Sequence, residues 1–85
     1  MSEILHQSDE HQFVCIVDGQ LSRLAYRPRD AGTVEAYSTQ VPSELRGQGI
    51  ADKLARAFYD WSQEKGLTIV PTCSYIEVWL RRNAK

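Results

Sequence analysis

The hydrophobic period of the sequence changes near its middle, and this change limits the chain to folds that combine a sheet with helices. Up to residue 41, apolar and polar residues alternate in short runs, as in half-buried β-strands. After residue 50, apolar residues recur every three or four positions, as on one face of an α-helix. With 85 residues, the chain can build one hydrophobic core but not two. We therefore expect a single α+β domain.

The first half predicts three strands joined by short turns. The first strand stops at Asp18-Gly19, the dipeptide that best suits a two-residue hairpin turn with positive φ. Pro28 is expected to end the second strand and Pro42 the third. Residues 1–10 are polar and without period, so we expect a flexible terminus followed by one domain at residues 11–85. The three strands of the expected antiparallel meander are His11–Val17, Gln20–Tyr26 and Thr33–Val41.

The second half predicts two helices with a strand between them. The first helix ends at Gly66, where a glycine commonly follows a helix. Residues 67–70 are a short apolar strand, and the crossover of about two dozen residues fits a right-handed βαβ unit that makes this strand parallel to the third. After Pro71, a shorter helix has Ser74 and Glu77 at the spacing of a capping box. The apolar stripes are Ile50, Leu54, Ala57, Phe58 and Trp61 on the first helix, and Ile76, Trp79 and Leu80 on the second.

A loop with two glycines and an arginine lies between the third strand and the first helix, and reads Leu-Arg-Gly-Gln-Gly-Ile-Ala at residues 45–51. Free N–H groups in a first helical turn attract an anion, glycines let the backbone approach it, and Arg46 can add charge-assisted hydrogen bonds. The loop is neither a P-loop nor a Rossmann fingerprint, which disfavours a nucleoside triphosphate or a dinucleotide. The alternative is a strand-to-helix turn that needs glycine only for its dihedral angles.

The order Arg-x-x-Gly-x-Ala at residues 46–51, after a strand that ends Val41-Pro42 and before an amphipathic helix, resembles the pyrophosphate-binding motif of the GNAT acetyltransferase superfamily. Together with Thr72-Cys73 and the segment Tyr75–Arg82, it is similar to small single-domain GNAT-like proteins of unassigned substrate. This resemblance covers about Asp18–Asn83 and implies a minimal GNAT-like fold that binds acetyl-CoA or coenzyme A.

In such proteins the glycine loop holds the pyrophosphate of coenzyme A, and the strand before it splays from the next parallel strand to admit the pantetheine arm. The resemblance therefore implies pyrophosphate contacts from Arg46, Gly47, Gln48, Gly49, Ile50 and Ala51, and pantetheine contacts from the backbone of Thr39, Gln40 and Val41.

Two cysteines and two isolated histidines offer neither a disulfide framework nor a zinc site. Cys73 lies at the expected start of the last helix, where the helix dipole favours a thiolate, whereas Cys15 lies within a strand. In the resembled family the cysteine that matches Cys73 lies near the acetyl end of the cofactor, which implies that Cys73 is catalytic and accepts acetyl as a thioester. The alternative is a small apolar residue that packs at a helix start.

The third strand lacks the histidine and glutamate that usually flank its threonine in the resembled family. This chain has Ser38 and Gln40 there, and neither titrates near neutral pH. Glu35 lies two pleats away on the same strand. Tyr37 and Tyr75 are either proton donors to a departing thiolate or packing residues.

Two functions stay open: an N-acetyltransferase with an unknown small-molecule or protein acceptor, and a non-catalytic module that binds coenzyme A or another protein. A nucleic-acid role rests only on the row Arg23, Arg27 and Arg29, because ten Lys and Arg against eleven Asp and Glu give a net charge of -1. No apolar run approaches the roughly 18 residues of a membrane span, and residues 1–9 lack a signal-peptide pattern. We expect a cytoplasmic protein with no membrane or nucleic-acid partner.

Overall fold

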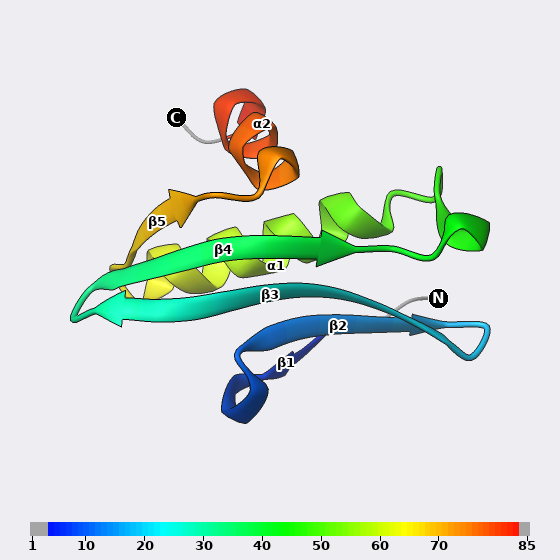
Figure 1. The fold of residues 1–85 in the computed structure, drawn as a ribbon, viewed down its shortest axis with the longest axis horizontal. Coiled ribbons are helices and arrows are strands. Elements are labelled where there is room, and N and C mark those ends of the chain that lie inside the picture. Colours follow the sequence, from blue (N-terminus) through cyan, green and yellow to red (C-terminus); the bar gives the residue numbers. More distant parts are fainter. Residues whose placement is uncertain (1–3, 84–85) are drawn as a thin grey trace.

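Five strands form one mixed sheet, and a long helix packs along one of its faces (Figure 1). The computed structural model describes residues 4–83. The strands lie in the order β1-β2-β3-β4-β5, with the first four antiparallel and β5 parallel to β4. This confirms the α+β fold with a meander, a parallel strand and two helices. The elements are β1 (Ile4–Gln7), a 3-10 turn (Ser8–Glu10), β2 (Gln12–Val17), β3 (Gln20–Asp30), β4 (Thr33–Gln40), a second 3-10 turn (Ser43–Leu45), α1 (Ile50–Glu64), β5 (Thr68–Pro71) and α2 (Ser74–Asn83).

Strand β1 corrects the expected flexible terminus at residues 1–10 for its described part, residues 4–10, while residues 1–3 lie outside the described residues. It pairs antiparallel with β2 along its whole length. His6 anchors it, because its Nε2 lies 2.6 Å from the hydroxyl of Tyr26 and its ring stacks on Phe13 with centroids 4.0 Å apart. Pairing with β2 and the aromatic contacts of His6 hold this segment, and neither leaves a periodic pattern in the sequence.

Strand β3 continues through Pro28, where the sequence predicted its end. Tyr26 donates its backbone N–H to the carbonyl of His11 at 2.9 Å. Because backbone directions alternate along a strand, an N–H at position 28 would point to the same side. Pairing with β2 reaches only to Ala25, so Pro28 lies on a local edge where its missing N–H costs no ladder bond.

Two predicted turns are confirmed by left-handed backbone angles. Asp18 and Gly19 have φ of 52° and 76°, as a two-residue hairpin turn requires. Gly66 has φ of 70° just after α1, and the next residue, Leu67, donates its N–H to the carbonyl of Ser62 at 2.8 Å. This closure ends the helix and directs the chain into β5.

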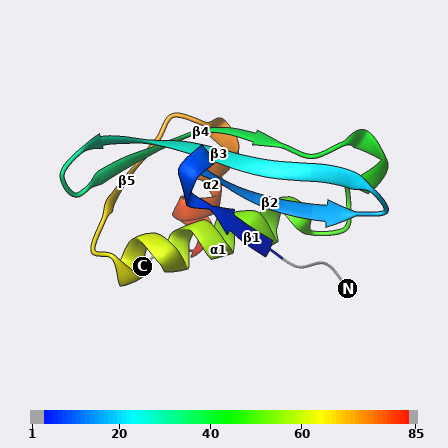
Figure 2. The same cartoon turned by 90° about the horizontal axis from the view of Figure 1, so that it is seen from below.

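The hydrophobic core lies between the sheet and α1, while the opposite face of the sheet carries no described helix (Figure 2). Helix α2 packs at the β5 edge and adds two buried side chains to the core (Figure 1). The buried core residues are Phe13, Cys15, Leu24, Tyr26, Val34, Ala36, Leu45, Ile50, Leu54, Ala55, Phe58, Ile76 and Trp79.

Candidate functional site

Strands β4 and β5 part halfway along β4. Their parallel pairing ends at Ala36 and Pro71, and one further backbone bond joins the N–H of Cys73 to the carbonyl of Ala36 at 3.0 Å. β4 then continues to Gln40 with no strand partner on that side among the described residues. Such a parting was expected as the entrance for a pantetheine arm.

A β-bulge in β4 coincides with this parting. The register with β3 shifts there, which leaves Tyr37 as an extra residue between Ala36 and Ser38. Beyond the bulge, Thr39 lies opposite the core residue Leu24, so Thr39 faces the helix side of the sheet. Its two neighbours on the strand therefore face the other way.

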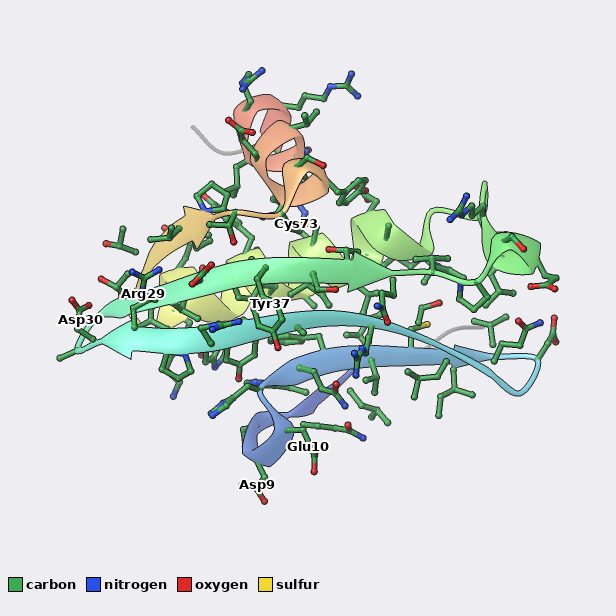
Figure 3. All side chains as sticks on the ribbon, in the orientation of Figure 1. Asp9, Glu10, Arg29, Asp30, Tyr37 and Cys73 are labelled. Atoms are coloured by element: carbon green, nitrogen blue, oxygen red, sulfur yellow. The ribbon has the colours of Figure 1, made fainter. Side chains whose placement is uncertain are left out.

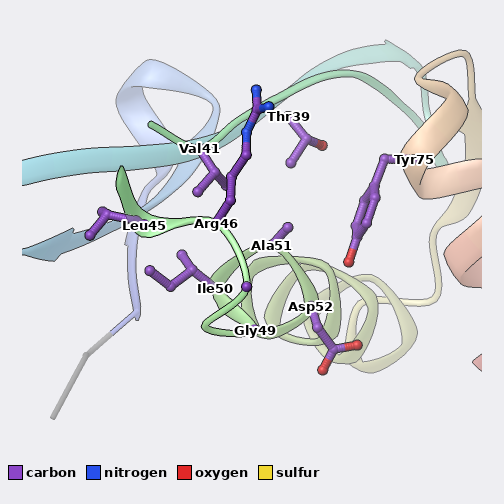
Figure 4. Close-up of a pocket in the computed structure, with 10 residues that line it drawn as sticks. Thr39, Val41, Leu45, Arg46, Gly49, Ile50, Ala51, Asp52 and Tyr75 are labelled. Atoms are coloured by element: carbon purple, nitrogen blue, oxygen red, sulfur yellow. The ribbon is translucent and has the colours of Figure 1, made fainter. Parts of the chain in front are cut away.

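A pocket of about 390 Å³ opens between the end of β4, the loop that follows it and the starts of α1 and α2 (Figure 4). All its lining residues except Leu45, Asp52 and Tyr75 were predicted as cofactor contacts from the sequence. Gln40 and Gln48, also predicted, do not line it. The lining consists of Thr39, Val41, Leu45, Arg46, Gly47, Gly49, Ile50, Ala51, Asp52 and Tyr75.

The glycine loop forms the N-terminal end of α1. Gly47 and Gly49 have φ of 87° and 76°, and the carbonyl of Gly49 accepts the first helical bond, from Lys53 at 3.0 Å. No side chain caps this turn, so its free N–H groups can bind an anion. A Cβ built on either glycine would have no heavy atom within 4 Å, so the space beside the loop is open to a ligand.

Two charged side chains of opposite sign line the pocket. Arg46 forms no ion pair or side-chain hydrogen bond with the described residues, so its guanidinium can pair with an anionic ligand. Asp52, by contrast, accepts a hydrogen bond from Nε1 of Trp79 at 2.7 Å, which ties α1 to α2.

Tyr75 reaches from α2 toward the start of α1 (Figure 4). Burial raises the pKa of Tyr75, and the negative charge of Asp52 raises it further, whereas Arg82 acts in the opposite direction. Its phenol therefore carries its proton at neutral pH and can donate it within the pocket.

The sequence model of the GCN5-related N-acetyl-transferase family matches residues 12–85. The chain belongs to this family. It is 35% identical to protein NATD1 of Xenopus tropicalis over 80 residues, and this aligned region covers 92% of this chain and 73% of that protein. Its identity to NATD1 of Homo sapiens is 34% over 80 residues, which cover 92% of this chain and 71% of the human protein. The solution NMR structure of a GCN5-like protein from Staphylococcus aureus superposes with a TM-score of 0.75 at 30% identity, covering 94% of this chain and 78% of that chain.

Cys73 of this GCN5-related protein lies just outside the pocket lining. Its carbonyl accepts the N–H of Glu77 at 3.0 Å, so Cys73 holds the N-cap position of α2 and the predicted capping box of Ser74 and Glu77 is off by one residue. Its Sγ lies 3.5 Å from the hydroxyl of Thr39, which does line the pocket. Cys15, in contrast, is completely buried in the core.

Glu35 is engaged in an ion-pair cluster outside the pocket lining. It accepts hydrogen bonds from the Thr72 hydroxyl at 2.7 Å and from Arg29 at 2.9 Å. The Thr72 bond and the Arg29 guanidinium lower the pKa of the Glu35 carboxyl, so it is a poor proton acceptor. Glu35 therefore does not replace the base that β4 lacks.

No functional role was predicted for Leu45 or Asp52 from the sequence. Asp52 lies on the polar side of the α1 pattern, and only the packing of α2 brings it to the pocket. Leu45 is buried under the loop, and its apolar character among polar neighbours was the available signal. Within residues 4–83, no cluster of histidine, cysteine or acidic residues could hold a metal ion. The described helices include none that is long and apolar enough to cross a membrane.

Proposed function

We propose that this protein binds acetyl-CoA or coenzyme A in the pocket at the start of α1. One observation carries the proposal: a single pocket joins the uncapped glycine loop to the place where β4 leaves β5. The first-turn N–H groups and Arg46 suit a pyrophosphate. From Thr39 to Val41 the backbone has no strand partner on the β5 side among the described residues, so it can offer hydrogen bonds to a pantetheine arm. A contact from Gln48 rests on the family resemblance, because Gln48 does not line the pocket.

Acetyl transfer to an unknown acceptor is the reaction that these residues support within the family. Tyr75 holds a proton that it can give to the departing CoA sulfur. In a thioester route, the Cys73 sulfur would bond the acetyl carbon while the bond from that carbon to the CoA sulfur breaks. The proton lost by Cys73 would end on the CoA sulfur, so CoA would leave as the thiol. To reach Cys73 from the pocket, the acetyl group would have to approach past Thr39, whose hydroxyl lies 3.5 Å from the Cys73 sulfur.

A non-catalytic CoA-binding or protein-interaction module is the second candidate. The orientation of the side chains along β4 favours it. Ser38 and Gln40 point away from the pocket, and neither can act as a base near neutral pH. Of the titratable side chains in the lining, Asp52 is already bonded to Trp79. The outward side chains of Ser38 and Gln40 and the engaged carboxylate of Asp52 thus favour acetyl-CoA binding without rapid turnover.

Calorimetric titration of acetyl-CoA into an Arg46→Ala variant tests the binding site. Loss of a charge-assisted contact worth about 1.5–3 kcal/mol should weaken binding roughly tenfold to a hundredfold. Arg81→Ala is the matched control, because Arg81 is exposed on α2 and pairs only with Glu77. If Arg46→Ala binds acetyl-CoA as tightly as the parent protein and the control, the site lies elsewhere.

A further inference from the structure

The face of the sheet opposite α1 carries three exposed aliphatic side chains next to the fully buried Val14. The cross-strand pairs Leu5 with Val14 and Ile16 with Leu21 place these residues together, and Val14 pairs with Arg23 on the same face. Leu5, Ile16 and Leu21 are 47%, 55% and 47% exposed. Figure 2 shows α1 on the other side of the sheet and no described helix over this one. We call this surface, together with Arg27 and Tyr37, the open face.

Arg23 borders the aliphatic side chains with most of its hydrogen-bonding capacity unused. Its Nη1 lies 3.4 Å from Oε1 of Gln12, and its Nε is buried without a partner. A guanidinium has five N–H donors, and the described residues place no carboxylate within ion-pair distance of this one.

Arg27 is the second cation of the open face without a carboxylate of its own. Its guanidinium lies over the Tyr37 ring, 4.4 Å from the centroid, and Tyr37 stands in front of the sheet in Figure 3. The distance from Arg27 to Glu35 is 3.9 Å, but Glu35 is already bonded to Arg29 at 2.9 Å. Arg27 and Arg29 therefore share one carboxylate and Arg23 has none within ion-pair distance among the described residues, so the predicted row of three arginines keeps a net positive charge.

We propose that the open face binds an extended acidic polypeptide segment that also carries aliphatic side chains. Charge complementarity supplies the acidic part, because Arg23, Arg27 and Arg29 have one carboxylate among them within ion-pair distance in the described residues, that of Glu35. The aliphatic part follows from Ile16 and Leu21. Arg27 lies six residue steps along β3 from Leu21, a span of about 20 Å that a short peptide can follow and a small anion cannot.

Other occupants fit this surface less well. A second copy of the chain needs roughly 800 Å² from each partner, far more than three half-exposed aliphatic side chains supply. A nucleic acid would use the arginines but leave the aliphatic side chains without a base to contact. The acetyl-CoA pocket opens on the opposite side of the sheet, so this inference stands apart from the proposed function.

An NMR titration tests the proposal with an octapeptide of alternating glutamate and leucine. Blocking both peptide ends prevents it from acting as an acetyl acceptor. Amide shifts should appear at residues 14–16 and 21–27 and not at residues 46–51. Arg27→Glu, at a side chain that is 58% exposed, should weaken peptide binding roughly tenfold or more, and Leu21→Ser should also weaken it. Arg81→Glu, on α2, should bind the peptide like the parent protein.

Several results would overturn the proposal. They are equal binding of a blocked lysine–leucine octapeptide, tighter binding of single-stranded octathymidylate, open-face shifts that depend on protein concentration without peptide, or no open-face shifts at all. Acetyl-CoA titrated into Arg27→Glu provides a separate readout. It should bind this variant as it binds the parent, so a failure of the open face and a failure of the pocket are distinguished.

Discussion

Gly49 allows the left-handed turn before α1 and is proposed to contact the ligand, and a matched pair of glycine variants can separate these two roles. Gly49 and Gly19 share φ of 76°, and a Cβ at either would meet nothing within 4 Å. Alanine at either position should therefore lower the free energy of unfolding by a similar amount, about 1 kcal/mol, through backbone strain alone. Only Gly49→Ala should also weaken acetyl-CoA binding, because only its backbone borders the pocket.

Urea denaturation and calorimetric titration of both glycine variants check this expectation. Equal stability losses with a binding loss in Gly49→Ala alone would support a ligand contact at the loop. Unchanged acetyl-CoA affinity in Gly49→Ala would show that the glycine serves the turn and not the ligand.

Turnover at the residue scale is limited because the pocket lining offers no free base. With Ser38 and Gln40 turned away from the pocket, we expect measurable acetyl-CoA affinity but little CoA release in the presence of simple amines. Joint Ser38→His and Gln40→Glu substitution should leave this release low, because both new side chains would lie on the far face of the sheet and the new carboxylate would lie opposite Arg23. A rise of ~10²–10⁴-fold, as a restored general base typically gives, would contradict this assignment of the two faces.

A thiol-reagent assay of released CoA measures this turnover. Vigorous release by the parent protein that is insensitive to both positions would place the base elsewhere. Mass spectrometry of the parent protein after exposure to acetyl-CoA examines the thioester route. An acetyl adduct on Cys73 that is missing in Cys73→Ser is the expected sign of that route.

At the element scale, β1 should make stability depend on pH through His6. Burial lowers the pKa of His6 from 6.5, and His11 lowers it further. Because the folded value lies below the unfolded one, the unfolded chain binds more protons as the pH falls through 6.5. The contribution of neutral His6 to the free energy of unfolding is therefore complete above pH 6.5. It is lost as the pH falls toward the lowered pKa that His6 has in the folded protein.

The urea midpoint should therefore decrease between about pH 7.5 and 5.5. His6→Phe keeps a ring against Phe13 and should flatten the profile, while His11→Asn should keep most of the slope because His11 is the smaller cause. Asparagine also tolerates the φ of 55° at position 11. An unchanged slope in His6→Phe would assign the pH dependence to other groups.

The elements that the sequence predicted are those with local signals. The three- and four-residue hydrophobic period predicts helix α1, and the Asp18-Gly19 dipeptide predicts the β2–β3 hairpin. A short apolar run after a crossover helix predicts β5. Strand β1, the passage of β3 through Pro28 and the bulge at Tyr37 depend on a partner strand, so no local pattern reveals them. The same division holds at the site, where the loop from Arg46 onward is visible in the sequence and Asp52 needs the packing of α2.

At the scale of the whole molecule, the sheet separates two surfaces. Helix α1 lies on one side of the sheet (Figure 2), and the pocket lies at the start of that helix. The open face with its arginines is on the other side. The bulge in β4 links them, because it turns Thr39 toward the pocket and its neighbours toward the open face. A ligand in the pocket and a peptide on the open face can therefore bind at the same time.

In the proposed function, the pocket holds the pyrophosphate and the pantetheine arm of acetyl-CoA together. An NMR titration of the parent protein with acetyl-CoA, coenzyme A and ATP side by side tests this. Amide shifts should appear at residues 46–51 and 39–41 with both coenzymes, whereas ATP should bind more weakly and leave residues 39–41 unshifted, because ATP lacks pantetheine. Identical shifts with all three ligands, or no shifts at residues 46–51, would contradict it.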